Sequence, residues 1–283
     1  MRLDDHALND FRHIPRKRFG QHWLKDQGVL DQIVKAAKLS SDDCVLEVGP
    51  GKGALTEKLI ESQARFIQAI ELDRDLIVGL KRRFSYQQKF SLREGDVLSA
   101  PLEAENGLTI NKVVANIPYN ITGPLLERLL GRLDRPSKTT YKRLILLLQK
   151  EVADRILASP GQSNFSALSV RVQLMAKCNH VCSVSPNSFK PPPKVDSTVI
   201  AIEPFSRSQC LESSTAIRVE ELLRKAFSSR RKKLRNTLVG LISLDKLAPL
   251  AREAGINLNQ RPQEISPGAW VQLAKGLNLF EKS

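Results

Sequence analysis

Cysteine is scarce in this chain of 283 residues, which contains only Cys44, Cys178, Cys182 and Cys210. Four scattered cysteines are too few for the disulfide framework of a small secreted protein. Cys178 and Cys182 flank His180, a spacing that could serve a metal, but no second cluster of Cys and His completes a four-ligand set. We therefore expect no metal site, and free thiols of the kind found in a reducing cytosol.

Long apolar stretches and leader-like segments are also missing. The longest uninterrupted apolar run covers residues 144–148, far short of the roughly 20 residues that span a bilayer. The first residues lack the positive-then-apolar pattern of a signal peptide, and the sequence has no repeats or low-complexity tracts. These absences favour a cytoplasmic protein without a membrane partner. The sequence shows no repeated apolar surface pattern that would indicate a dimer, so we expect a monomer.

Acidic residues are outnumbered. The chain has 44 Lys and Arg against 30 Asp and Glu, which gives a formal net charge of +14. A surplus of that size favours polyanionic partners, and nucleic acid is the first candidate. Part of the surplus is local, because eight Lys and Arg stand between Arg218 and Arg235 against only Glu220 and Glu221. We interpret this stretch as a footprint for a phosphate backbone, with a solvated helix face as the alternative.

Apolar runs alternate with segments of helical periodicity over the first 204 residues. Strands are expected at 44–48, 66–70, 90–93, 113–115, 141–148, 180–184 and 195–202. This alternation predicts an α/β fold, a Rossmann-like and mostly parallel sheet of seven strands. After Glu203 only helices are expected, at 217–227, 230–241, 244–254 and 267–278. We therefore predict a domain over residues 1–204, with a loose N-terminal arm over 1–15, and a smaller all-helical domain over 205–283.

A glycine loop, Gly49-Pro50-Gly51-Lys52-Gly53, separates the strand at 44–48 from a helix that begins near Ala54. A strand, a glycine loop and a helix form the turn at which nucleotides bind. The next strand ends at Glu71, where an acid can accept hydrogen bonds from ribose hydroxyls. The glycine spacing also satisfies the dinucleotide fingerprint, so dehydrogenases and methyltransferases both remain open. Glu47, just before the loop, disfavours a pyrophosphate.

Polar residues follow two more strands. Asp96 comes after the strand at 90–93 and could accept a hydrogen bond from an adenine amine, with a turn aspartate as the alternative. Asn116-Ile117-Pro118-Tyr119 follows the strand at 113–115. The Asn116 side chain and the Ile117 carbonyl are two acceptors beside the flat ring of Tyr119, which suits an amine-bearing base. The alternative is a turn in which Asn116 caps and Tyr119 packs.

Two further segments point to the same site. Residues 12–24 mix cations with Phe19 and Trp23, which indicates docking onto the sheet or onto a base. Asp26 is expected to cap the helix that follows. Pro191-Pro192-Pro193 stiffens the loop over residues 186–194, and we expect this loop to present Phe189 to the site.

These motifs together resemble, in their order, the ribosomal RNA adenine dimethyltransferases. The resemblance runs from Arg16 to the C-terminus and is carried by Arg16-Lys17-Arg18-Phe19-Gly20-Gln21-His22-Trp23-Leu24, Leu46-Glu47-Val48-Gly49-Pro50-Gly51, Glu71-Leu72-Asp73, Gly95-Asp96, Asn116-Ile117-Pro118-Tyr119-Asn120, Phe189-x-Pro191-Pro192-Pro193-Lys194-Val195-Asp196-Ser197 and Ala226-Phe227-Ser228-Ser229-Arg230-Arg231-Lys232. It is strongest to the bacterial branch that acts on the small-subunit (16S) RNA.

The resemblance implies S-adenosyl-L-methionine as the cofactor and two adjacent adenines near the 3′ end of 16S rRNA as the methylated bases, within the small ribosomal subunit or its precursor. The cofactor contacts that it implies are His22, Leu24, Gly49, Gly51, Glu71, Asp96 and Asn116. The catalytic residues that we predict are Asn116, Ile117, Tyr119 and Phe189. The family commonly has Asn at the position of His22 and Leu at the position of Lys52.

Four alternatives stay open at the level of the sequence. They are a large-subunit (23S) rRNA methyltransferase of the antibiotic-resistance type, a ribosome-assembly factor whose methylation is incidental, a DNA adenine methyltransferase and an NAD-dependent oxidoreductase. The triple-proline loop and the long helical C-terminal part favour the small subunit.

Overall fold

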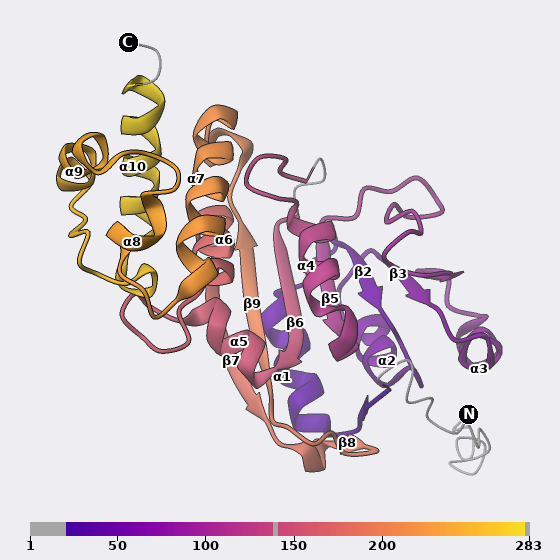
Figure 1. The fold of residues 1–283 in the computed structure, drawn as a ribbon. Helices are drawn as coiled ribbons and strands as arrows, with labels where there is room; N and C mark the ends of the chain where they lie inside the picture. Colours follow the sequence, from indigo (N-terminus) through magenta and orange to yellow (C-terminus); the bar gives the residue numbers. More distant parts are fainter. Residues whose placement is uncertain (1–20, 138–140, 281–283) are drawn as a thin grey trace. The chain divides into compact units, whose positions relative to one another are not determined.

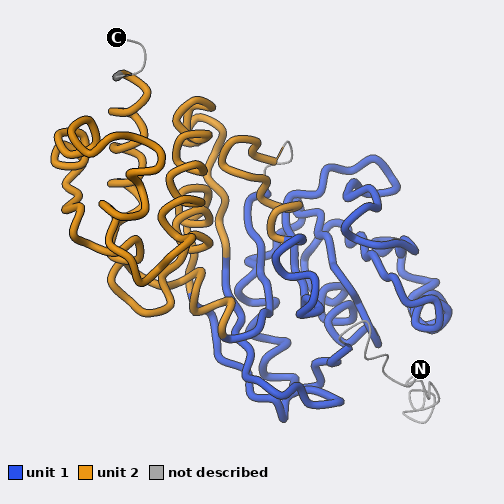
Figure 2. The backbone as a smooth tube through the Cα atoms, in the orientation of Figure 1, with its two compact units in different colours: residues 1–125, 141–150, 180–201 blue, residues 126–140, 151–179, 202–283 orange. Residues whose placement is uncertain are grey.

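The computed structural model describes residues 21–137 and 141–280. The predicted N-terminal arm over residues 1–15 and the basic start of the docking segment lie outside these ranges. Within them, no helix has both the length and the apolar character needed to cross a bilayer. The backbone falls into two compact units, shown in Figure 2. Unit 1 contains residues 1–125, 141–150 and 180–201, and unit 2 contains residues 126–140, 151–179 and 202–283.

A seven-stranded sheet has the strand order β4-β3-β2-β5-β6-β9-β7 (Figure 1). Its strands are β2 (Cys44–Val48), β3 (Phe66–Glu71), β4 (Phe90–Glu94), β5 (Lys112–Asn116), β6 (Arg143–Gln149), β7 (Ala176–Val184) and β9 (Ser197–Pro204). Strands β4, β3, β2, β5 and β6 pair in parallel. The predicted Rossmann-like, mostly parallel sheet is therefore confirmed.

Unit 1 also contains the helices α1 (Gln27–Ala37), which precedes β2, and α2 (Ala54–Glu61) and α3 (Arg74–Phe84), which follow β2 and β3. The predicted cap of α1 is confirmed, since Oδ1 of Asp26 accepts a hydrogen bond from the backbone N–H of Val29 at 3.2 Å. The apolar face of α1 packs on the sheet, where Leu30 and Ile33 join the same buried cluster as Val45. This cluster keeps the strand ends, and with them the loops of the site, in fixed register.

A small two-stranded sheet joins segments that are far apart in the sequence. In it, β1 (Trp23–Leu24) pairs antiparallel with β8 (Phe189–Lys190), and the register sets Leu24 opposite Phe189. Both of these side chains are buried in the core of unit 1. The pairing therefore ties the N-terminal docking segment to the proline-rich loop.

Unit 2 is mainly helical. Its helices include α6 (Ala167–Met175), α7 (Ser213–Ala226), α8 (Leu234–Leu238), α9 (Leu244–Glu253) and α10 (Pro267–Phe280), while α4 (Thr122–Leu130) and α5 (Lys150–Leu157) begin in unit 1. One buried cluster, with Trp270 and Leu222 among its members, forms the core of the unit. The functional division into residues 1–204 and 205–283 stays a prediction.

The predicted helix over residues 230–241 is wrong in extent. Helix α7 tightens into the 3₁₀ turn η6 (Phe227–Ser229), and Lys233 then adopts an extended backbone with ψ 151° before the five residues of α8 begin. Leu234 and Leu238, four positions apart in α8, are both buried, as helical spacing requires. The break at Lys233 lies before Leu234 and leaves the spacing of the apolar positions in α8 unchanged, so periodicity alone does not reveal it.

Candidate cofactor and substrate site

A cavity of about 270 Å³ lies in unit 1, where β2, β3, β4 and β5 end. Eight of the ten predicted site residues line it: His22, Gly49, Gly51, Glu71, Asp96, Asn116, Ile117 and Tyr119. They come from loops that are distant in the sequence, and they meet because the carboxyl ends of parallel strands lie at one edge of the sheet. The cavity is close in size to pockets that hold small ligands.

The other two predicted residues lie elsewhere. Leu24 lines a smaller adjoining cavity of about 40 Å³, together with Gly49, Gly51 and Asn116. The expectation that the proline-rich loop presents Phe189 to the site is wrong, because this side chain is only 2% exposed and packs in the core. The alternation of β8 turns Phe189 inward and leaves Lys190 exposed.

The glycine loop brings bare backbone to the edge of the cavity. Gly51 has φ +60°, and a Cβ added to it would lie 2.8 Å from the Trp23 ring, so no larger residue fits without displacing that ring. Lys52 follows, with its Nζ 4.4 Å from the centre of the same ring. The Trp23 ring therefore packs against the glycine loop. The backbone of Gly51 lines the cavity.

Glu71 ends β3 and is 7% exposed. Its Oε1 accepts the backbone N–H groups of Leu72 and Asp73, each at 2.9 Å, and its Oε2 accepts that of Gly51 at 3.1 Å. Burial raises the pKa of this carboxyl, and the three hydrogen bonds oppose that rise. A carboxylate offers about four acceptor positions, so one remains, on Oε2. The arrangement favours one direct bond to a ribose hydroxyl rather than two.

Asp96 combines a turn hydrogen bond with a position at the cavity. Its Oδ1 accepts the backbone N–H of Leu98 at 2.9 Å, as a turn aspartate does. Its exposed carboxyl group also lines the cavity, with Oδ2 as the further acceptor.

Asn116 is oriented by one hydrogen bond. Its Nδ2 donates to the backbone carbonyl of His22 at 3.0 Å. The amide nitrogen is thereby engaged, and Oδ1 is the group left as an acceptor. Next to it, the backbone N–H of Ile117 donates to the carbonyl of Leu147 at 3.3 Å, which holds the peptide between Asn116 and Ile117, immediately before the second predicted acceptor.

His22 and Tyr119 form a stacked pair whose ring centres are 5.8 Å apart, with an angle of 26° between the planes. Nδ1 of His22 lies 2.9 Å from the carbonyl oxygen of Pro191. A carbonyl only accepts, so Nδ1 must carry the hydrogen. The Tyr119 hydroxyl lies 2.5 Å from that of Ser197, and burial raises the pKa of this phenol.

Sequence reasoning missed two residues that help to build the site. Gln21 lines the cavity and donates from Nε2 to Oδ2 of Asp73 at 2.7 Å. Ser197 ends the proline-rich motif but was given no role. Their places inside recognised motifs were the only signal, since neither residue type is specific for this chemistry.

Across residues 21–137 and 141–280, no group of three or more His, Cys, Asp or Glu is arranged to hold a metal ion. All four cysteines are free thiols, and burial raises the pKa of Cys178 to about 12.

Comparison with known proteins gives consistent matches. Residues 12–279 match the family described as "Ribosomal RNA adenine dimethylase". The chain is 68% identical over 274 residues to "Ribosomal RNA small subunit methyltransferase A" of Prochlorococcus marinus strain NATL2A, covering 96% of this chain and 94% of the relative. The identity to the protein of the same name from Synechococcus sp. strain CC9902 is 64% over 266 residues, covering 94% and 97%.

Solved structures agree with the sheet and its helices. A dimethyladenosine transferase from Plasmodium falciparum is 31% identical, with a TM-score of 0.75 over 92% of this chain and 98% of that one. A 23S rRNA methyltransferase, ErmE, is 24% identical with a TM-score of 0.72 over 90% and 99% of the two chains, and shares the fold.

Proposed function

This chain belongs to the ribosomal RNA adenine dimethylase family, and from that premise we propose that it dimethylates two adjacent adenines near the 3′ end of 16S rRNA. The observation that carries the proposal is the meeting of Glu71, Asp96 and Asn116 with Tyr119 in one cavity. Relatives that are 59–68% identical carry the small-subunit name, which favours this branch over the large-subunit alternative. The enzyme acts in the maturation of the small ribosomal subunit.

The methyl donor of the family is S-adenosyl-L-methionine, whose sulfonium carries an activated methyl group. The cavity fits such a ligand, because the Gly51 backbone is bare and Glu71 and Asp96 each keep an acceptor position. We assign the ribose to Glu71 and the adenine amine of the cofactor to Asp96. His22, Leu24 and Gly49 complete the binding set, with Asn116 at the border between cofactor and target base.

The reaction needs a nucleophilic nitrogen, and an adenine amine is a poor one because its lone pair is delocalised into the ring. Oδ1 of Asn116 and the carbonyl of Ile117 accept the two amine hydrogens and favour a more pyramidal nitrogen. The Tyr119 ring stacks on the base and fixes its plane. Positioning of this kind can supply on the order of 7–11 kcal/mol of the barrier. The proton released after transfer leaves to water.

RNA binding is assigned to the basic stretch of unit 2. Its seven exposed cations are Arg224, Lys225, Arg230, Arg231, Lys232, Lys233 and Arg235, of which Arg230 also donates to the carbonyls of Ser163 and Phe165. The two nearby acids are paired with other arginines, Glu220 with Arg171 at 2.8 Å and Glu221 with Arg218 at 2.9 Å. The exposed cations therefore keep their positive charge for phosphates.

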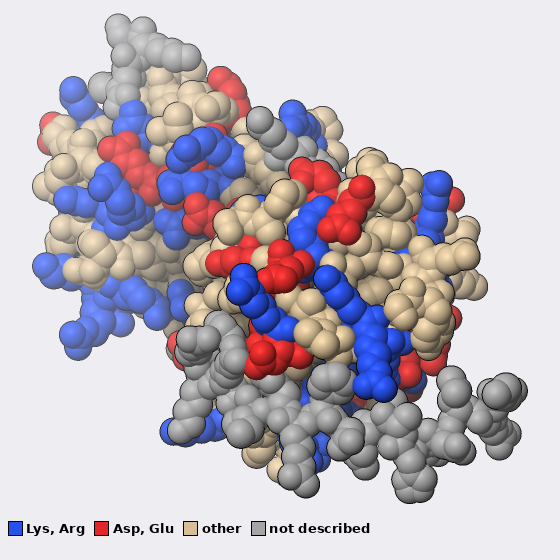
Figure 3. Space-filling model, turned by 90° about the vertical axis from the view of Figure 1, so that its right-hand side faces the viewer, with Lys and Arg blue, Asp and Glu red and all other residues tan. Residues whose placement is uncertain are grey.

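Over the centre and right of Figure 3 basic and acidic side chains are interleaved, whereas basic side chains predominate at the lower left. We accordingly place the chemistry in residues 1–204 and the main RNA contact in residues 205–283.

The test is methyl transfer from labelled S-adenosylmethionine to immature small subunits and, separately, to free large-subunit RNA. We expect two dimethylated adenines in the small-subunit RNA alone. Label only on the large-subunit RNA would overturn the branch. Titration calorimetry with S-adenosylmethionine and with NAD should show binding of the first ligand only, and the reverse result would reject the enzyme class.

A further inference from the structure

We propose that Ser197 is a positioning residue, whose hydroxyl holds the Tyr119 ring in the plane against which the target adenine stacks. The inference rests on the proposed function and deepens it, because it names a residue that controls how completely the base is methylated. Ser197 begins β9 and is fully buried, so its side chain does not touch the target base directly. Its effect must pass through Tyr119.

The contact between the two hydroxyls is short and joins residues from distant parts of the sequence. Oη of Tyr119 and Oγ of Ser197 are 2.5 Å apart, although 78 positions separate the residues in the sequence. The backbone of Tyr119 is held too, since its carbonyl accepts a hydrogen bond from Oγ1 of Thr122 at 3.3 Å. The ring is therefore fixed at its base and at its tip, and it cannot tilt without breaking the bond to Ser197.

One face of the Tyr119 ring is covered by His22, at 5.8 Å between ring centres. His22 is itself anchored, by Nδ1 to the Pro191 carbonyl at 2.9 Å and by its own carbonyl to Nδ2 of Asn116 at 3.0 Å. Since Tyr119 also lines the cavity, its uncovered face is the one available to a base. Ser197 thus completes a chain of contacts that fixes the stacking plane relative to Asn116.

The phenol itself has no free role in proton transfer. Burial raises the pKa of Tyr119 above its usual value, and the hydroxyl is already bonded to Ser197. A neutral, engaged hydroxyl is a poor general base. What Tyr119 offers the target is its ring, and what Ser197 controls is the angle of that ring.

Dimethylation makes this angle matter most in the second step. An unmodified adenine amine has two hydrogens, one each for Asn116 and Ile117. After the first transfer a methyl group replaces one hydrogen, so one of the two hydrogen bonds to the base is lost. Orientation of the monomethylated base then depends more on stacking. A loosened Tyr119 ring should therefore slow the second methylation more than the first.

The test is a double-mutant cycle with Ser197→Ala, Tyr119→Phe and the combination of both. Each single variant removes one partner of the same hydrogen bond and keeps the ring. We expect each to lower kcat for RNA roughly five- to tenfold, to accumulate monomethyladenosine measured by nucleoside mass spectrometry, and to leave the KM for S-adenosylmethionine unchanged. The double variant should match the single ones, because the bond can be lost only once. Thr198→Val, which removes a buried hydroxyl from the next residue of the strand, serves as the control and should dimethylate normally.

Three results would overturn the proposal: strictly additive effects, single variants that dimethylate at the wild-type rate, or a Tyr119→Phe defect far larger than that of Ser197→Ala, which would give the phenol a direct role. Thermal melting monitors folding. If Ser197→Ala proves unstable, Tyr119→Phe alone must still accumulate the monomethyl product. Wild-type protein that fails to methylate any RNA would reject the proposed function instead, so the two failures are distinguishable.

Discussion

The two ends of the paired central strands β2 and β5 use polar residues in opposite ways. At the amino ends, Asp43 and Lys112 are buried and bonded to each other. At the carboxyl ends, Glu47 has no hydrogen-bond partner and Asn116 keeps one acceptor. One edge of the sheet has satisfied its buried charges. At the opposite edge Asn116 keeps an acceptor beside the cavity, and Glu47 is buried without a partner. The first edge serves stability, and the second serves binding.

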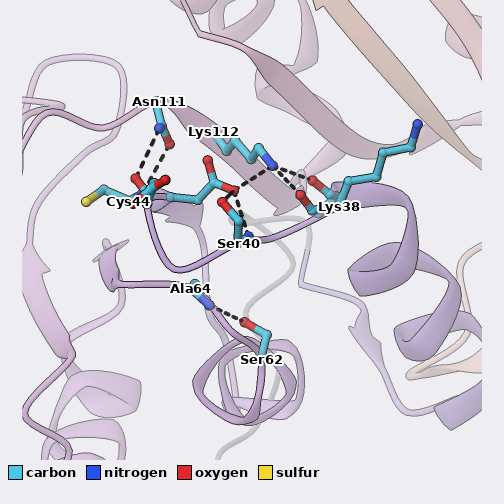
Figure 4. A network of polar contacts seen from close by, with 10 residues as sticks. Lys38, Ser40, Cys44, Ser62, Ala64, Asn111 and Lys112 are labelled. Carbon is cyan, nitrogen blue, oxygen red and sulfur yellow. Dashed lines mark hydrogen bonds and ion pairs between the residues drawn. The ribbon is translucent and has the colours of Figure 1, made fainter.

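The satisfied edge is a closed network, part of which Figure 4 shows around Lys112, Lys38 and Ser40. Nζ of Lys112 lies 2.7 Å from Oδ2 of Asp43 and donates to the carbonyls of Ala37 and Lys38 at the end of α1. The same Asp43 oxygen accepts from the N–H and the hydroxyl of Ser40 at 2.8 and 2.9 Å. Burial alone would raise the pKa of Asp43, but these bonds hold it below its usual value.

The largest effect is therefore expected at the satisfied edge. Lys112→Met keeps the aliphatic stem but leaves a buried carboxylate without its cation, which should lower the free energy of unfolding by about 3–5 kcal/mol. Urea denaturation measures it. The kcat of the folded fraction should stay unchanged, because the network is at the edge opposite the cavity. Adding Asp43→Asn should recover part of the loss. A drop in kcat with normal stability would break the comparison.

For Asn116→Ala we expect the reverse of Lys112→Met, a large loss of kcat with little loss of stability. Removal of the amide takes away an acceptor for the target amine and the bond to His22, and such preorganised groups are worth roughly 10²–10³ in kcat. Stability should change little, since the side chain is only partly buried. Methyl transfer to small-subunit RNA and thermal melting of the same sample separate the two effects. Full activity in this variant would remove Asn116 from the catalytic set.

Glu47 permits a test by pH. It is fully buried, and burial raises its pKa from 4.5 to about 8, which the nearby Thr56 hydroxyl only partly offsets. Below about pH 4.5 both the folded and the unfolded state are protonated, so no stability is lost. Between pH 4.5 and 8 the unfolded chain releases the proton while the folded chain keeps it, so stability falls as pH rises and levels off above about 8.

A glutamine cannot titrate, so the stability of Glu47→Gln should not fall over this pH range. Relative to the wild type, the variant should gain on the order of 3 kcal/mol in the free energy of unfolding between pH 5 and pH 8. Denaturant titrations at both pH values measure the difference. Glu61→Gln, at the end of α2 on an exposed position, is the matched control and should follow the wild-type pH dependence. Equal pH dependence of Glu47→Gln and wild type would show that Glu47 is charged in the folded state.

The sequence predicted the functional edge better than the stabilising one. Asn116, Glu71 and Asp96 stand at strand ends within motifs, so the order of the strands was enough to bring them together. The Asp43–Lys112 pair was not foreseen, because its partners are 69 positions apart and neither lies in a motif. Phe189 was misplaced for a related reason: its burial depends on pairing between β1 and β8, which no local pattern records.

Substitution of Lys52 should have the smallest effect on stability and on cofactor binding. Its Nζ lies over the Trp23 ring at the functional edge, but the side chain is exposed. A cation–π contact at such a site contributes about 0.5–1 kcal/mol, so Lys52→Leu should lower stability by no more than this and weaken cofactor binding only a few-fold. Lys52→Arg keeps a cation over the ring and should behave as the wild type. Calorimetric titration with S-adenosylmethionine measures the binding. A loss in Lys52→Leu as large as that of Lys112→Met would mean that the functional edge also depends on a paired charge, and the contrast between the two edges would fail.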